Sequence, residues 1–145
     1  MLRVRDVMST YVEFVEPEST IKAAAELMGE LDVGALPAGS PEHLEGVLTD
    51  RDILYRVVAR GLDPSRVRVR DVLSRPVAAC TEDNSVQEAM DAMAANQIRR
   101  MPVHDATGRV TGWVTLADLS RKLLIDSQTL QTALLEVTED ARAAP

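Results

Sequence analysis

The chain has 145 residues, with 16 Lys and Arg against 23 Asp and Glu, a formal net charge of −7, and only 3% aromatic residues. An acidic chain with so few stacking side chains is not built to bind nucleic acid. One cysteine and two histidines supply too few soft ligands for a structural zinc, so we expect no metal site. No apolar run is long enough for a membrane helix and the first residues are charged, so we expect a cytoplasmic protein without membrane contact.

The two halves of the chain repeat each other. Residues 3–9 (RVRDVMS) return as residues 68–74 (RVRDVLS), and residues 46–53 (GVLTDRDI) return as residues 112–119 (GWVTLADL). A unit of about 60 residues is marginally stable alone, so the two copies are expected to pack against each other. We predict a first unit over residues 1–66, a second over 67–124, and a C-terminal segment over 125–145.

Each unit is predicted to run strand, helix, strand, strand, helix. The first strands are short β-branched runs. The helices that follow begin at the N-caps Ser19-Thr20 and Asn84-Ser85, with Ser85 and Glu88 spaced as a capping box, and carry apolar residues at helical spacing. The predicted strands cover residues 12–15, 44–48, 77–80 and 110–114, with short strands ending at Pro37 and Pro102, and the closing helices cover residues 50–60 and 116–124.

The predicted fold class is α+β, with two pseudo-twofold-related β-α-β-β-α units packed sheet to sheet. A C-terminal amphipathic helix is expected from residue 126 onward, followed by a frayed end over residues 140–145. This helix packs either on its own chain or on a second subunit, and the sequence leaves both open. Its apolar face consists of Leu130, Ala133, Leu134 and Val137.

The junctions between the last strand and the closing helix carry the most informative side chains. Thr49 and Asp52 follow the first of these strands, and Thr115 and Asp118 follow the second. Thr-x-x-Asp is itself a helix-capping arrangement, so a purely structural role is one interpretation. The other is binding, because a carboxylate at the end of a strand can accept both hydroxyl protons of a neutral diol such as a ribose edge. Both copies keep the pair while the residues between them differ, which favours binding.

With these junctions the repeat resembles a tandem CBS-domain pair, or Bateman module, over residues 2 to about 124. Residues 48–53 (LTDRDI) and 61–64 (GLDP) resemble especially the small stand-alone bacterial CBS-pair proteins of the hypoxic-response type. The resemblance implies a regulatory module that binds an adenosine nucleotide (AMP, ADP or ATP) between its units, needs no cofactor, forms a homodimer and signals to an effector protein. The implied ribose contacts are Thr49, Asp52, Thr115 and Asp118.

The resemblance also implies apolar walls for an adenine. Because aromatic residues are so few, we expect the base to lie between aliphatic side chains and strand backbone, without a stacking ring. For each wall residue, a place in the ordinary hydrophobic core is the alternative. The implied wall residues are Val12, Leu36, Pro37, Val77, Met101 and Pro102.

Phosphates require local positive charge in a chain of net charge −7. Arg99 and Arg100 are the best candidates, although neighbouring strand residues face opposite sides and at most one should reach the cleft directly. The first copy has Gly34 and Ala35 at the matching positions. We therefore expect the second copy to hold the better phosphate site, unless Arg99 or Arg100 crosses the pseudo-dyad or Arg51 turns into the first.

No motif pairs a nucleophile with a base, and no Gly-rich phosphate loop with lysine is present, so we expect no enzymatic activity. Cys80 is expected to be a buried free thiol. Two functions stay open: a nucleotide-responsive regulatory module, and a dimeric scaffold with the same fold in which the Thr-x-x-Asp pairs act only as helix caps.

Overall fold

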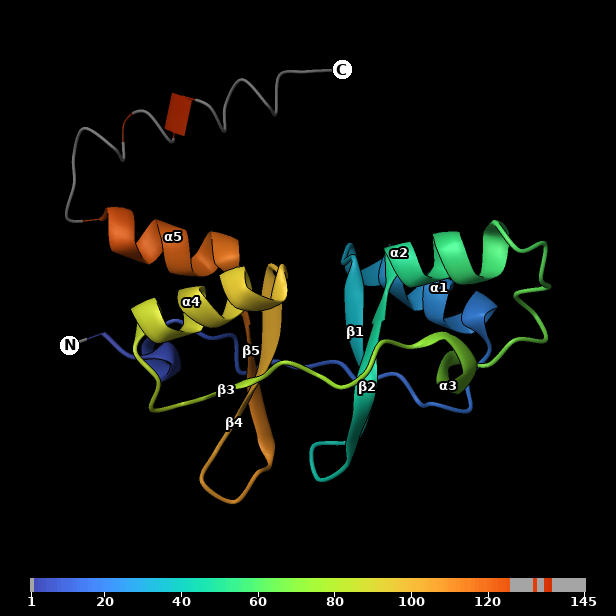
Figure 1. The fold of residues 1–145 in the computed structure, drawn as a ribbon, viewed down its shortest axis with the longest axis horizontal. Coiled ribbons are helices and arrows are strands. Elements are labelled where there is room, and N and C mark those ends of the chain that lie inside the picture. The colour runs from blue at the N-terminus through green and yellow to red at the C-terminus, as the bar shows by residue number, and fades with distance from the viewer. Residues whose placement is uncertain (1, 126–131, 133–134, 137–145) are drawn as a thin grey trace.

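The computed structural model describes residues 2–125, 132, 135 and 136. Its two halves stand side by side, with the sheets facing each other in the middle and the longer helices outside them (Figure 1). This arrangement confirms the predicted α+β fold of two related units packed sheet to sheet.

Unit 1 is built on an antiparallel strand pair. Its elements are α1 (Ile21–Leu31), β1 (Ala35–Gly39), β2 (Leu44–Thr49), the short α2 (Asp50–Ile53) and a π-helical turn, η2 (Leu54–Val58). In the β1–β2 ladder, Leu36 lies opposite Leu48, and both side chains point into a core that also holds Ile21 and Met28.

Unit 2 has a three-stranded sheet of order β3-β4-β5. Its elements are β3 (Cys80–Thr81), α4 (Val86–Asn96), β4 (Arg100–His104), β5 (Val110–Thr115) and α5 (Leu116–Leu124). β3 pairs in parallel with β4, and β4 pairs antiparallel with β5. The core beneath this sheet contains Met93, Met101 and Leu119.

Both long helices begin as the sequence predicts. The Thr20 hydroxyl accepts the Ala23 N–H at 3.1 Å, and the Ser85 hydroxyl accepts the Glu88 N–H at 3.0 Å. The Glu88 carboxylate accepts the Ser85 N–H in return, so the capping box is complete. These bonds satisfy N–H groups that a helix start otherwise leaves without partners.

The repeated RVRDV segments form short helices that are exchanged between the units. η1 (Val4–Asp6) places Val4 in the core of unit 2, and α3 (Val69–Val72) places Val69 and Val72 in the core of unit 1. The chain therefore crosses between the halves twice, as Figure 1 shows. The second crossing, residues 74–79, is called the connecting segment below.

Three element predictions are corrected by the structure. The strand expected at residues 77–80 is reduced to β3, and the one expected at 12–15 is reduced to a single bridge from Val15 to Ala38. Most of each segment spans the gap between the units, where no neighbouring strand can pair with it. The helix expected over residues 50–60 is α-helical only to Ile53, continues as η2 and ends at Val58.

The predicted C-terminal helix falls on residues that, apart from 132, 135 and 136, lie outside the described part of the chain. Within the described residues, no helix has the length and apolar character that crossing a bilayer requires.

Candidate functional site

A cleft of about 810 Å³ lies where the two units meet. Unit 1 contributes the residues around α2, unit 2 contributes the turn into β4, and the connecting segment contributes a third wall. We call it the arginine cleft. Its polar and charged lining residues are Thr49, Asp50, Arg51, Asp52, Tyr55, Arg56, Ser74, Asn96, Gln97, Arg99 and Arg100.

Thr49 and Asp52 form a closed capping box in this cleft. The Thr49 hydroxyl accepts the Asp52 N–H at 3.1 Å, and Asp52 Oδ2 accepts the Thr49 N–H at 2.9 Å. Asp52 is 7% exposed and is the single buried charged residue in the described part of the chain. The helix-capping interpretation therefore describes real bonds of this pair, and a ligand would meet a carboxylate that is already partly engaged.

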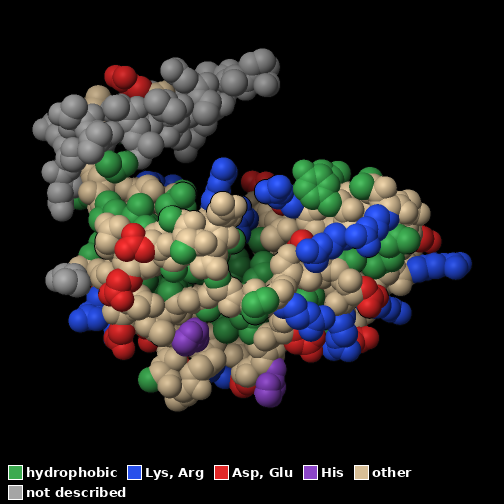
Figure 2. All heavy atoms as spheres, in the orientation of Figure 1, with side chains coloured by type: hydrophobic (Ala, Val, Ile, Leu, Met, Phe, Trp, Pro, Cys, Tyr) green, Lys and Arg blue, Asp and Glu red, His purple; other side chains and the backbone are tan. Residues whose placement is uncertain are grey.

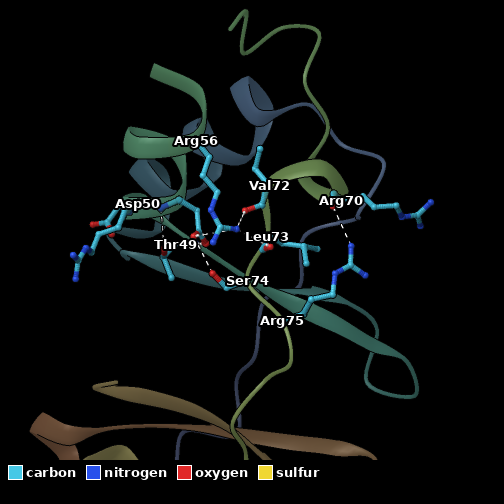
Figure 3. A network of polar contacts seen from close by, with 10 residues as sticks. Thr49, Asp50, Arg56, Arg70, Val72, Leu73, Ser74 and Arg75 are labelled. Atoms are coloured by element: carbon cyan, nitrogen blue, oxygen red, sulfur yellow. Dashed lines mark hydrogen bonds and ion pairs between the residues drawn. The ribbon is translucent and has the colours of Figure 1, made fainter. Parts of the chain in front are cut away.

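Ser74 and Arg56 tie this carboxylate to the connecting segment. The Ser74 hydroxyl donates to Asp52 Oδ1 at 2.9 Å. Arg56 Nη1 donates to the carbonyl oxygens of Val72 and Leu73 at 2.9 and 3.2 Å, and lies 3.8 Å from Asp52 Oδ1 (Figure 3). A cation beside the last carbonyls of α3 is favourable, because those groups lack partners within the helix.

The structure brings the two phosphate candidates to the first Thr-x-x-Asp pair. Arg99 and Arg100 line the same cleft as Thr49 and Asp52, although Arg100 lies opposite Thr115 of the second pair in the β4–β5 ladder. The two arginines of unit 2 thus cross the pseudo-dyad to reach the motif of unit 1, an arrangement that the sequence left open. Gly34 lies at this crossing, since a Cβ built there would be 3.3 Å from an Arg100 guanidinium nitrogen.

The lining of the arginine cleft is positive although the chain is acidic. Four arginines and two aspartates give it a formal charge of +2, against −7 for the whole chain. Blue Lys and Arg side chains gather above the hollow between the two halves (Figure 2). Among the described residues, Arg99 and Arg100 form no ion pair, which leaves both guanidinium groups available to an anion.

The predicted apolar walls divide into two groups. Val77 and Pro102 line the cleft. Leu36 and Met101 do not, because their side chains lie in the two hydrophobic cores with 2% and 0% of their surface exposed. Val12 and Pro37 are also outside this lining: Val12 is half-buried in the first crossing, and Pro37 is buried opposite Val47 in the β1–β2 ladder.

Sequence reasoning missed several lining residues, and Tyr55 is the most informative of them. It lies on η2, is 56% exposed, and has the Arg51 guanidinium 5.6 Å from its ring centre. An aromatic ring therefore lines this cleft in addition to the aliphatic side chains that the sequence predicts. The spacing of Arg51 and Tyr55 in the closing helix was a usable signal. Gln97, which ends α4 in the left-handed region at φ 53°, carried none.

The second Thr-x-x-Asp pair is not part of the arginine cleft. The Thr115 hydroxyl accepts the Asp118 N–H at 3.2 Å, but the Asp118 carboxylate forms an ion pair with Arg121 instead of closing a capping box. Asp118 is 31% exposed, far more than Asp52. The two motif carboxylates thus differ in their hydrogen-bond partners and in their exposure to solvent.

The glycines that open the two motifs have a structural reason. A Cβ on Gly46 would lie 2.7 Å from the Ser74 carbonyl oxygen, and one on Gly112 would lie 2.9 Å from the Ser9 carbonyl oxygen. In each unit the exchanged segment crosses directly over the strand, and only glycine permits that approach.

Cys80 lies on β3 as a buried free thiol, as predicted. Burial raises the pKa of this thiol to about 11. Within the described residues, no group of three or more His, Cys, Asp or Glu side chains is placed to hold a metal ion.

Fold and site together define a tandem-repeat α+β module whose cleft is shared by both repeats. The sequence model of the CBS domain matches residues 4–59 and 69–125, and the chain belongs to this family. CBS-domain pairs are regulatory modules, which agrees with the class expected from the sequence.

Relatives of similar length exist. The chain is 39% identical to Hypoxic response protein 1 of Mycobacterium tuberculosis over 124 residues, covering 85% of this chain and 86% of that protein. The crystal structure of Hypoxic Response Protein I with two coordinated zinc ions has a TM-score of 0.74 at 38% identity, covering 82% of this chain and 97% of that one. A hexameric CBS-CP12 protein from bloom-forming cyanobacteria has a TM-score of 0.74 at 25% identity, covering 99% and 86%.

Proposed function

We propose that the protein is a regulatory module that binds an adenosine nucleotide (AMP, ADP or ATP) in the arginine cleft and signals its presence to a partner chain. One observation carries the proposal: Thr49 and Asp52 line the same cleft as Arg51, Arg99 and Arg100, although the two groups come from different units. A ribose and a phosphate chain can then be held at once, so the ligand bridges the units.

The ribose is assigned to Thr49 and Asp52. An ionised carboxylate accepts hydrogen bonds and donates none, which matches the two hydroxyl protons of a ribose edge. A hydrogen bond to a charged group is worth about 1.5–3 kcal/mol, so this contact alone changes affinity by tenfold or more.

The phosphates are assigned to Arg99 and Arg100, with Arg51 as a further cation. Guanidinium groups form paired, charge-assisted hydrogen bonds with phosphate oxygens. Val77 and Pro102 supply the apolar wall for the base, and the exposed Tyr55 ring offers a face for stacking.

Thr115 and Asp118 are proposed as a second, weaker ribose position. The repeat places Gly34, Ala35 and Ala117 at the positions equivalent to Arg99, Arg100 and Arg51. Without those cations, the phosphates of a ligand contribute less to its affinity at this second position. We therefore expect tight binding of one nucleotide per chain.

A thermal-shift panel tests this function. AMP, ADP and ATP should raise the melting temperature, while adenosine without phosphates should raise it less. The double variant Arg99→Ala/Arg100→Ala should reduce the nucleotide shifts to the level of adenosine. Arg66→Ala is the matched control, because Arg66 is exposed and outside the cleft. Equal shifts in the double variant and in the control would exclude the assigned phosphate site.

Self-association is also proposed. Leu54, Val58 and Leu62 are 51%, 62% and 44% exposed on and just after η2, and together they form an apolar strip. The hexameric CBS-CP12 relative supports self-association in general. We propose a homodimer as the basic unit, with a further effector protein as the recipient of the signal. Sedimentation of wild-type protein and of Val58→Glu tests the contribution of this strip.

A specific observation favours the alternative function, a ligand-independent scaffold. The capping box of Thr49 and Asp52 is already complete within the protein, so the pair has a structural role without any ligand. If no adenosine nucleotide changes the melting temperature while the protein sediments as a tight dimer, the scaffold function is the correct one.

Two coordinated zinc ions are present in the Hypoxic Response Protein I structure, and we do not carry that property over to this chain. The described residues offer no cluster of His, Cys, Asp and Glu for such an ion, and Cys80 is buried in the sheet core. We therefore propose nucleotide binding without a metal site.

A further inference from the structure

The Asp52 carboxylate is engaged on both oxygens before any ligand arrives. Oδ2 accepts the Thr49 N–H, and Oδ1 accepts the Ser74 hydroxyl, both at 2.9 Å. Because the side chain is only 7% exposed, little of it is left open to a third partner. A carboxylate has about four acceptor sites in all, but this burial leaves little room for a ribose edge to donate two hydroxyl protons beside both existing bonds.

The two engaged oxygens are not equally easy to free. The bond from Thr49 N–H belongs to the helix cap, and breaking it would undo the start of α2. The bond from Ser74 involves a hydroxyl on a single rotatable side chain, which can turn away at small cost. Oδ1 is therefore the oxygen that a diol can capture.

The bond from Ser74 is not a necessary consequence of the repeat. Ser9 occupies the equivalent position in the first exchanged segment, and its hydroxyl donates to the Tyr11 carbonyl at 3.2 Å. Asp118, the equivalent of Asp52, pairs with Arg121. Among the described residues, only unit 1 joins its motif carboxylate to the exchanged segment.

Ser74 is also the first residue of the connecting segment. Its N–H donates to the Val47 carbonyl at 2.9 Å and its carbonyl accepts the Val47 N–H at 3.1 Å, which fixes it on β2. The next residues, Pro76 to Ala78, line the arginine cleft and lead into unit 2. Arg56 holds the two carbonyls just before Ser74 (Figure 3).

We propose that Ser74 is a competing residue: its hydroxyl occupies the Asp52 oxygen that the ribose needs, so ligand binding displaces it and loosens the start of the connecting segment. This inference rests on the proposed function of the cleft. It names the link by which an occupied cleft changes how the two units are joined.

The affinity of Ser74→Ala tests the competition, because its sign separates two roles. Removing a hydroxyl that contacts the ligand weakens binding, whereas removing a hydroxyl that competes with the ligand strengthens it. Displacing a hydrogen bond to a charged group costs at least about 1.5 kcal/mol, so Ser74→Ala should bind ATP about tenfold more tightly than wild type by calorimetry. Ser9→Ala, the matched control, should bind as wild type. Unchanged or weaker ATP binding by Ser74→Ala overturns the inference.

Amide hydrogen exchange gives a readout that needs no ligand. In Ser74→Ala, the amides of residues 74, 75 and 77–79 should exchange faster than in wild type, and Ser9→Ala should leave them unchanged. If Ser74→Ala is poorly folded, Ser74→Cys keeps the shape with a weaker donor and should shift affinity and exchange in the same directions.

The two hypotheses fail differently. If neither wild type nor Ser74→Ala binds AMP, ADP or ATP, the proposed function is wrong. If exchange in residues 74–79 is the same in wild type, Ser74→Ala and Ser74→Cys, the bond does not restrain the segment and the inference is wrong whatever the cleft binds.

Discussion

Because the motif is repeated, two matched substitutions are available: Asp52→Ala and Asp118→Ala. They measure how much the motif aspartate contributes to the free energy of unfolding in each copy. Asp52→Ala removes two hydrogen bonds from a side chain that is 7% exposed, and leaves the Thr49 N–H without its acceptor. Each bond to a charged group is worth about 1.5–3 kcal/mol, and the two share one carboxylate, so we expect a loss of about 3 kcal/mol in the free energy of unfolding. Asp118→Ala removes an ion pair with the exposed Arg121, which is worth less than about 1 kcal/mol.

Urea unfolding followed by circular dichroism measures both losses without any ligand. The slope with urea should stay the same in the two variants, so that a shift of the midpoint reports stability alone. Equal losses for Asp52→Ala and Asp118→Ala would refute the claim that the two carboxylates are held differently.

Three further predictions concern the fold. Gly46→Ala should destabilise by about 1–3 kcal/mol because its Cβ would meet the Ser74 carbonyl, whereas Gly29→Ala, with open space and a helical position, should stabilise by up to about 1 kcal/mol in the same urea assay. Because burial raises the pKa of Cys80 to about 11, its native thiol should resist alkylation at pH 8, and stability should fall as pH rises from about 9 toward 11, a slope that Cys80→Ala lacks. The hydrogen bonds from Ser85 hold the pKa of Glu88 below its ordinary value, so stability should fall as pH drops below about 4.5, and less steeply in Glu88→Gln; identical acid profiles would contradict this.

Periodic and repeated features of the fold were predictable from the sequence. The capping box of Ser85 and Glu88 and the closing helix over residues 116–124 appear where the pattern places them. The strands at 12–15 and 77–80 were overestimated because a β-branched run indicates an extended chain but not a neighbour to pair with. The exchange of Val4 and Val69 between the cores depends on long-range packing, which one copy of a repeat does not reveal.

The residue types of the candidate site were predictable from the sequence, but which of those residues share one cleft was not. Thr49 and Asp52 stand out because the motif recurs, and Arg99 and Arg100 stand out because cations are needed. Which motif the arginines face depends on how the units meet, and the sequence left open whether they cross the pseudo-dyad. Ser74 carried no signal, because its bond to Asp52 joins residues 22 positions apart through the exchanged segment.

A crystal structure of the protein grown with ATP tests the central claim most directly. The account predicts a nucleotide in the arginine cleft, with ribose hydroxyls on Asp52, phosphate oxygens within hydrogen-bond distance of Arg99 or Arg100, and the Ser74 hydroxyl turned away from Oδ1. A nucleotide seated at Thr115 and Asp118 with an empty arginine cleft, or no bound nucleotide at saturating ATP, would contradict it.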